Sequence, residues 1–131
     1  MTPTVLFYNL DNEKGRKLKV LCLGLKLRVR SVPPEEFGQT LDAVLGLAPK
    51  QEEPEQGEPF SEEMLVMAGL SSQQMNGFLQ GFRRKKIPAV PLKAVLTGTN
   101  GQWSGYRLRE ELQLEHQAML RGETAHEESR T

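Results

Sequence analysis

The stretch MLVMAGLSSQQMNGFLQGFRRKKIP, residues 64–88, decides the fold because it joins an apolar strand to a helix with clear ends. Its first seven residues are almost wholly apolar, as in a buried strand. Ser71 and Gln74 have the spacing of a capping box, in which each side chain bonds the other residue's backbone N–H. The apolar side chains that follow recur on one helical face: Met75, Phe78, Leu79 and Phe82. We therefore predict a strand, and then a helix that ends before Pro88.

The first half of the chain shows the same order of elements. The apolar run 5–10 predicts a buried strand, and Asp11-Asn12 supplies a helix cap. The helix that follows has an apolar face made of Leu18, Leu21, Cys22 and Leu25. The alternating segment 27–32 predicts an edge strand, with Arg28 and Arg30 on the side opposite Val29. A further helix is predicted over 35–47, because a proline and two glutamates suit a helix start.

With a strand predicted over 91–97 and a last helix from residue 104, each half reads strand, helix, strand, helix. The sequence thus predicts an α/β fold, in which two βαβα halves form one four-stranded sheet with packed helices. If the helix over 35–47 is a crossover, all four strands can run parallel with helices on both faces, which suits the helix content slightly better. If it is only a connection, the halves pair antiparallel, as in a ferredoxin-like α+β split βαβ with helices on one face. Both arrangements put the first and third strands in the centre.

Composition divides the chain into four parts. The first half ends at residue 47, and residues 48–61 form an acidic linker rich in Pro, Glu and Gln, which we expect to be mobile. The second half spans 62–121, and the polar tail 122–131 is predicted to be disordered.

Charge and cysteine content narrow the classes of function. Lys plus Arg equals Asp plus Glu at 17 each, so the whole chain has no net field that would draw it to nucleic acid or to an anionic membrane. No run approaches the roughly 18 apolar residues of a membrane span. The lone Cys22 excludes an internal disulfide and agrees with a reducing compartment. We therefore expect a cytoplasmic protein that does not contact a membrane.

No set of side chains predicts catalysis, a metal site or a cofactor. The only two histidines are His116 and His126, and His126 lies in the polar tail. Glu111, Glu115 and His116 do not converge as metal ligands, because adjacent residues on a helix diverge by about 100°. A hydrolase built on a histidine base is therefore not expected.

A candidate binding site lies in the stretch PLKAVLTGTNGQW, which begins at Pro91. Lys93 and Thr97 share one face of the predicted strand, and Asn100 and Trp103 follow where the strand gives way to a helix. One interpretation makes Lys93 a solvated edge residue, and Trp103 a cap of the core or a subunit contact. The other makes the strand-to-helix loop a small-anion site with Lys93 as the counter-charge, since ligands of open α/β sheets bind at such ends.

A second candidate surface is the basic run Arg83, Arg84, Lys85 and Lys86 at the end of the predicted helix. Cations there complement the helix dipole, which explains the run without a ligand. The same run would also suit the phosphates of RNA or DNA, although no aromatic side chains are interleaved with it. The acidic linker has the charge needed to fold over the run and mask it.

The second half resembles a bacterial family known as domain of unknown function 3783, from about Glu62 to Met119. The resemblance rests on LKAVLT and on the L-x-x-EL-x-x-EH helix. The family pattern falls on Lys93, Ala94, Thr97, Asn100, Trp103, Leu108, Glu111, Leu112 and Glu115. The first half is similar to the N-terminal region of that family's longer members. The resemblance implies a fold unit built around the candidate site, and it implies no activity.

From these observations we expect a small, non-catalytic regulatory or protein-interaction domain that acts through Lys93, Thr97, Asn100 and Trp103. Its partner is expected to be an unknown protein or a second copy of the chain, because each half is short and its strands are apolar on both faces. A small-anion or nucleotide-binding module at the loop 97–104 is the first alternative. Nucleic-acid binding through residues 83–86 is the second.

Overall fold

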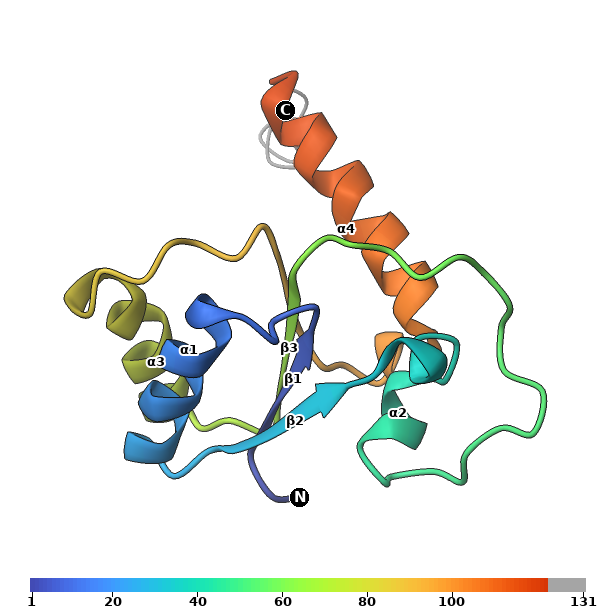
Figure 1. Ribbon diagram of the computed structural model, residues 1–131, viewed down its shortest axis with the longest axis horizontal. Coiled ribbons are helices and arrows are strands. Elements are labelled where there is room, and N and C mark those ends of the chain that lie inside the picture. Colours follow the sequence, from blue (N-terminus) through green and yellow to red (C-terminus); the bar gives the residue numbers. More distant parts are fainter. Residues whose placement is uncertain (123–131) are drawn as a thin grey trace.

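Each half of the chain folds as a strand, a helix and a second strand that pairs parallel with the first (Figure 1). The computed structural model describes residues 1–122, so nearly all of the predicted tail, including His126, lies outside the described part. In the first half the elements are β1 (Thr4–Tyr8), α1 (Glu13–Gly24) and β2 (Arg28–Val32). In the second half they are β3 (Met64–Ala68), α3 (Ser72–Arg84) and β4 (Leu92–Val95). A longer helix, α4 (Gly105–Leu120), follows β4.

The four strands form one mixed sheet in the order β2-β1-β3-β4. β1 pairs antiparallel with β3, and Leu6 lies opposite Val66 in the middle of both strands. The predicted α/β fold of two βαβ halves, with the first and third strands in the centre, is thereby confirmed. The halves meet antiparallel, as in the ferredoxin-like alternative. The two strands of each half are direct neighbours, however, and helices cover both faces of the sheet.

Two hydrophobic cores lie on opposite faces of the sheet because successive strand residues point in opposite directions. On one face, Val5 and Phe7 pack with α1 and α3, which lie side by side (Figure 1). On the other face, Leu6 and Tyr8 pack with α2 (Leu41–Val44) and α4. Both central strands are buried along their whole length, so the sheet is the middle layer of three.

The prediction of one helix over residues 35–47 is wrong. Only a single 3-10 turn (Pro34–Glu36) and the one-turn α2 form there. Gly38 lies so close to the backbone of Glu55 that a side chain would not fit. The Thr40 hydroxyl accepts from the Ala43 N–H at 3.2 Å and starts a new helix instead. The segment is therefore a connection with local caps, which is the condition under which the halves pair antiparallel.

Residues 48–61 contain no helix or strand, but they are anchored to the α2 and α4 side of the molecule. The Gln51 N–H donates to the Gln39 side chain at 2.8 Å, and the Tyr106 hydroxyl donates to the Gly57 carbonyl at 2.9 Å. Phe60 is buried and stacks on Phe37, with ring centroids 4.6 Å apart. These contacts differ from the mobile linker that composition predicts. They also hold the linker away from residues 83–86, so the structure contradicts the masking hypothesis.

The helix caps predicted from the sequence are present in the structure, and the predicted apolar face of α3 is buried in part. The capping box of Ser71 and Gln74 is present, and Cys22 is buried on the α1 face as expected. Leu79 differs from the expectation, because its side chain is 42% exposed. Burial raises the pKa of the Cys22 thiol to about 12, so this cysteine is a poor nucleophile in the folded protein.

Candidate binding grooves at the two sheet edges

Thr97 and Asn100 fix the turn that follows β4. The Thr97 N–H donates to Asn100 Oδ1 at 2.8 Å, and the Asn100 N–H donates to Thr97 Oγ1 at 3.0 Å. Asn100 Nδ2 also donates to the Val95 carbonyl at 2.9 Å, and the Asn100 side chain is nearly buried. These hydrogen bonds stabilise the turn, so both residues have a structural role that requires no ligand.

Lys93 lies on the outer strand of the sheet, with its side chain on the α3 face. Its ammonium is 5.7 Å from the centre of the Phe82 ring and donates to the Val90 carbonyl at 3.3 Å. The residue is exposed, and Leu92 and Ala94 point to the opposite core, as the alternation of the strand predicts. Lys93 therefore has the geometry of an edge lysine that runs along apolar surface.

Trp103 is half-buried and joins the two halves of the chain. Its carbonyl accepts from the Leu41 N–H at 3.0 Å, and its ring lies 4.5 Å from the Arg107 guanidinium carbon. Within residues 1–122, no hydrogen-bond partner of its indole N–H is found. A half-buried tryptophan with an unused N–H is a common anchor in binding surfaces.

A groove of about 290 Å³ between β4 and α4 brings all four candidate residues together: Lys93, Thr97, Asn100 and Trp103. The opposite wall is α4, which contributes Glu111 and Glu115, one helical turn apart, and Leu112 between them. These residues also belong to the family pattern noted in the sequence. Two carboxylates against one lysine make the groove suited to a cationic partner.

The turn beside this groove offers few donors to an anion. The N–H groups of Thr97 and Asn100 bond within the turn, and the Gly101 N–H donates to the Thr97 carbonyl at 3.0 Å. Glu111 and Glu115 would repel an anion from the same groove. The geometry therefore gives less support to the small-anion interpretation than to a binding surface for a cation.

The basic run 83–86 ends α3 beside the start of α1, because the two helices run antiparallel. At one end Lys14 Nζ donates to the Ala89 carbonyl at 2.9 Å, and at the other Gln74 donates to the Leu25 carbonyl at 3.2 Å. This layer carries five Lys or Arg side chains in residues 13–26 and four in residues 72–86, against one Glu. The helices on this face of the sheet are therefore strongly basic, although the net charge of the whole chain is zero.

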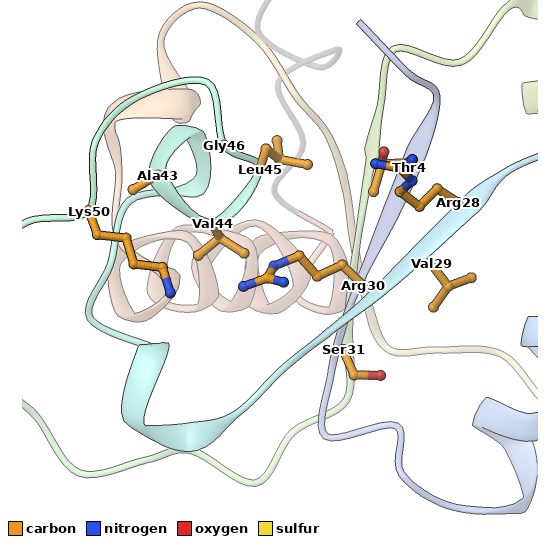
Figure 2. A pocket seen from close by; sticks show the side chains of 10 residues that line it. All are labelled: Thr4, Arg28, Val29, Arg30, Ser31, Ala43, Val44, Leu45, Gly46 and Lys50. Atoms are coloured by element: carbon orange, nitrogen blue, oxygen red, sulfur yellow. The ribbon is translucent and has the colours of Figure 1, made fainter.

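A second groove, of about 550 Å³, lies at the opposite edge of the sheet, between β2 and α2 (Figure 2). Its charged lining residues are Arg28, Arg30 and Lys50, and no carboxylate from the described part of the chain lines it. The sequence places Arg28 and Arg30 on one strand face, but it gives no sign that Lys50 and α2 close a groove over them. Sequence reasoning therefore missed this site, since the fold of the 35–50 segment creates it.

Glu36 is the acidic neighbour of this second groove. One carboxylate oxygen accepts from Arg30 Nη2 at 3.1 Å and the other from Lys50 Nζ at 3.3 Å. The Arg30 Nε and the Tyr8 hydroxyl are shielded from solvent and have no hydrogen-bond partner among residues 1–122. Burial, followed by the negative charge of Glu36, raises the pKa of the Tyr8 hydroxyl. The Tyr8 side chain is therefore a neutral donor at all ordinary pH values.

Within residues 1–122, no three His, Cys, Asp or Glu side chains come together in a way that could hold a metal ion. None of the helices in that range is long and apolar enough to cross a membrane.

Comparison with known proteins finds a match for the second half of the chain. Residues 63–119 match the family model described as "Domain of unknown function (DUF3783)". No curated protein and no solved structure matches the chain. The matched segment begins just before β3 and ends one residue before the end of α4, so it contains one complete strand–helix–strand unit and the whole β4–α4 groove. The second half of this chain, residues 63–119, is therefore similar to the DUF3783 family.

Proposed function

We propose that the protein is a non-catalytic interaction domain that holds a basic, extended segment of a partner protein in the groove between β4 and α4. The observation that carries this proposal is the groove itself, where an edge strand, Trp103 and the carboxylates of Glu111 and Glu115 meet. Thr97 and Asn100 shape the groove, and Trp103 contacts the partner. The Lys93 ammonium lies toward Phe82 on the α3 face, so Lys93 contributes its backbone and not its charge.

The backbone of β4 supports binding by strand addition. The Leu96 N–H donates inward to the Met67 carbonyl at 2.9 Å, so by alternation the N–H groups of Lys93 and Val95 point away from the sheet. A peptide laid along this edge would bond those groups and set alternate side chains against α4. Lysine or arginine at these positions would meet Glu111 and Glu115.

The test uses an eight-residue peptide of alternating lysine and threonine, and the fluorescence of Trp103 as the readout. Trp103 is the only tryptophan in the chain, so a change in emission reports on this groove. We expect the basic peptide to shift the emission and a glutamate–threonine peptide of equal length to leave it unchanged. Glu111→Gln should weaken binding about twofold to fivefold, the range of a partly exposed charge pair.

The matched control is Glu110→Gln, which removes the same charge from the neighbouring, exposed position on α4. It should leave the affinity for the basic peptide unchanged. Equal losses in the two variants would mean that only the overall charge of the helix matters, and the groove would lose its role. A shift in the emission with inorganic phosphate, absent in Lys93→Ala, would instead favour the small-anion alternative.

A second candidate function, nucleic-acid binding, is favoured by the meeting of residues 83–86 with the basic start of α1. A labelled single-stranded oligonucleotide should then bind with an affinity that falls with salt, with a slope of about −0.7 per phosphate neutralised. Removing two charges with Lys85→Gln and Lys86→Gln should reduce that slope. Lys50→Gln, on the other face of the sheet, should not. An affinity independent of salt would exclude this function.

A further inference from the structure

The β2–α2 groove has a strong excess of positive charge. It gathers Arg28, Arg30 and Lys50, and the carboxylate of Glu36 is shared between Arg30 and Lys50. One carboxylate cannot neutralise three cations, so these four side chains together carry an excess of positive charge at this edge. Arg30 is held in place by its bond to Glu36, and its side chain is only 40% exposed. Glu36 accepts from only one of the guanidinium nitrogens, so Arg30 keeps donors for a second carboxylate.

The backbone of β2 offers a row of hydrogen-bonding groups beside these cations. The Arg28 N–H donates inward to the Pro3 carbonyl at 2.9 Å, and β2 is an outer strand of the sheet. By alternation, the N–H and C=O groups of Val29 and Ser31 point away from β1. Figure 2 shows the strand running past the groove, with the Arg30 side chain reaching from it toward Val44 and Lys50.

The wall opposite the strand is apolar. α2 and the residue after it contribute Ala43, Val44 and Leu45 to the groove. A ligand must therefore combine negative charge with a backbone that can pair with a strand and with some apolar surface. A peptide has all three properties, whereas a small inorganic anion has only the first.

We propose that the β2 edge and its basic groove bind an extended acidic segment of a partner protein, which adds to the sheet beside β2. Side chains two residues apart on such a segment face the same side, so an Asp/Glu-x-Asp/Glu pattern would place carboxylates against Arg28 and Arg30. This surface is independent of the β4–α4 groove, because it lies at the other edge of the sheet and has the opposite charge.

The experiment measures binding of a labelled eight-residue peptide of alternating glutamate and threonine to the full chain by fluorescence anisotropy. We expect Arg30→Gln to weaken binding about fivefold or more, and Arg84→Gln, an exposed arginine at the end of α3, to leave it unchanged. Glu36→Gln should strengthen binding about threefold, because it removes the competing carboxylate. A gain in affinity cannot result from a variant that fails to fold.

Strand addition is tested on the peptide rather than on the protein. A glutamate–threonine peptide with alternate N-methylated amides keeps its charge but loses backbone donors, so its affinity should fall about tenfold. Equal affinity of the methylated and unmethylated peptides would overturn strand addition. Equal competition by free glutarate or inorganic phosphate at the same charge concentration would overturn it as well, and would make the groove a small-anion site. If the affinity of the peptide is the same for Glu36→Gln and Arg30→Gln as for the unaltered protein, the peptide does not bind in the β2–α2 groove.

Discussion

Asn100 shows how a single residue can attract a functional interpretation for a structural reason. In the sequence it stands in a turn beside Lys93 and Trp103, where ligands of α/β proteins often bind. In the structure its side chain makes two of the bonds that close the turn, to the Thr97 N–H and to the Val95 carbonyl. The sequence could predict that the turn is special, but not which groups the turn itself uses.

Replacing Asn100 with alanine should lower the free energy of unfolding by about 1–3 kcal/mol, the cost of leaving partly buried backbone groups without partners. The measurement is urea unfolding followed by far-ultraviolet circular dichroism. Thr97→Ser is the matched control, because serine keeps the hydroxyl that accepts from the Asn100 N–H. A loss for Asn100→Ala no larger than that for Thr97→Ser would mean that the turn holds its shape by other means.

At the scale of the element, strands and capped helices were predictable because their signals are local. The alternation in residues 27–32 and the Ser71–Gln74 box each act within a few residues, and both are found in the structure. The prediction of a helix over 35–47 failed because the contacts that interrupt this helix come from residues distant in the sequence. Phe37 turns into the core against Phe60, and Gly38 fits against the backbone of Glu55.

The same limit applies to surfaces that two elements build together. Residues 83–86 and the start of α1 lie far apart in the sequence, and only the antiparallel packing of α1 and α3 joins them. Likewise, Arg30 and Lys50 meet only because the 35–50 segment folds back along β2. A sum of charges over the chain cannot detect either surface, whereas the residues of the family pattern can be read from the sequence and line the β4–α4 groove.

At the scale of the whole molecule, the two halves are related by an approximate two-fold axis. Leu6 and Val66 are each the middle residue of their strand, and they lie opposite each other in the antiparallel pair. On each side of this pair the same order of strand, helix and strand is repeated. The sequence predicted the repeat of elements, but the direction in which the halves meet depends on the connection between them.

This symmetry leads to a prediction about the second half alone. A fragment of residues 58–122 lacks β1, so its β3 edge is exposed and should pair with β3 of a second copy around Val66. We expect sedimentation analysis to give twice the fragment mass. Val66→Lys, which sets two like charges face to face, should give a monomer or an unfolded chain. A folded monomer of the unaltered fragment would show that β3 does not need a neighbour.

The antiparallel junction of β1 and β3 has a consequence for how the two grooves can differ. A dimer of identical subunits must carry the same groove twice, and a mutation that suits one partner alters both copies. In a single chain, each half can change alone, and here one edge carries Arg28 and Arg30 while the other carries Glu111 and Glu115. If both proposed ligands bind, the chain would act as an adaptor that brings two partners of opposite charge to the two edges of one sheet.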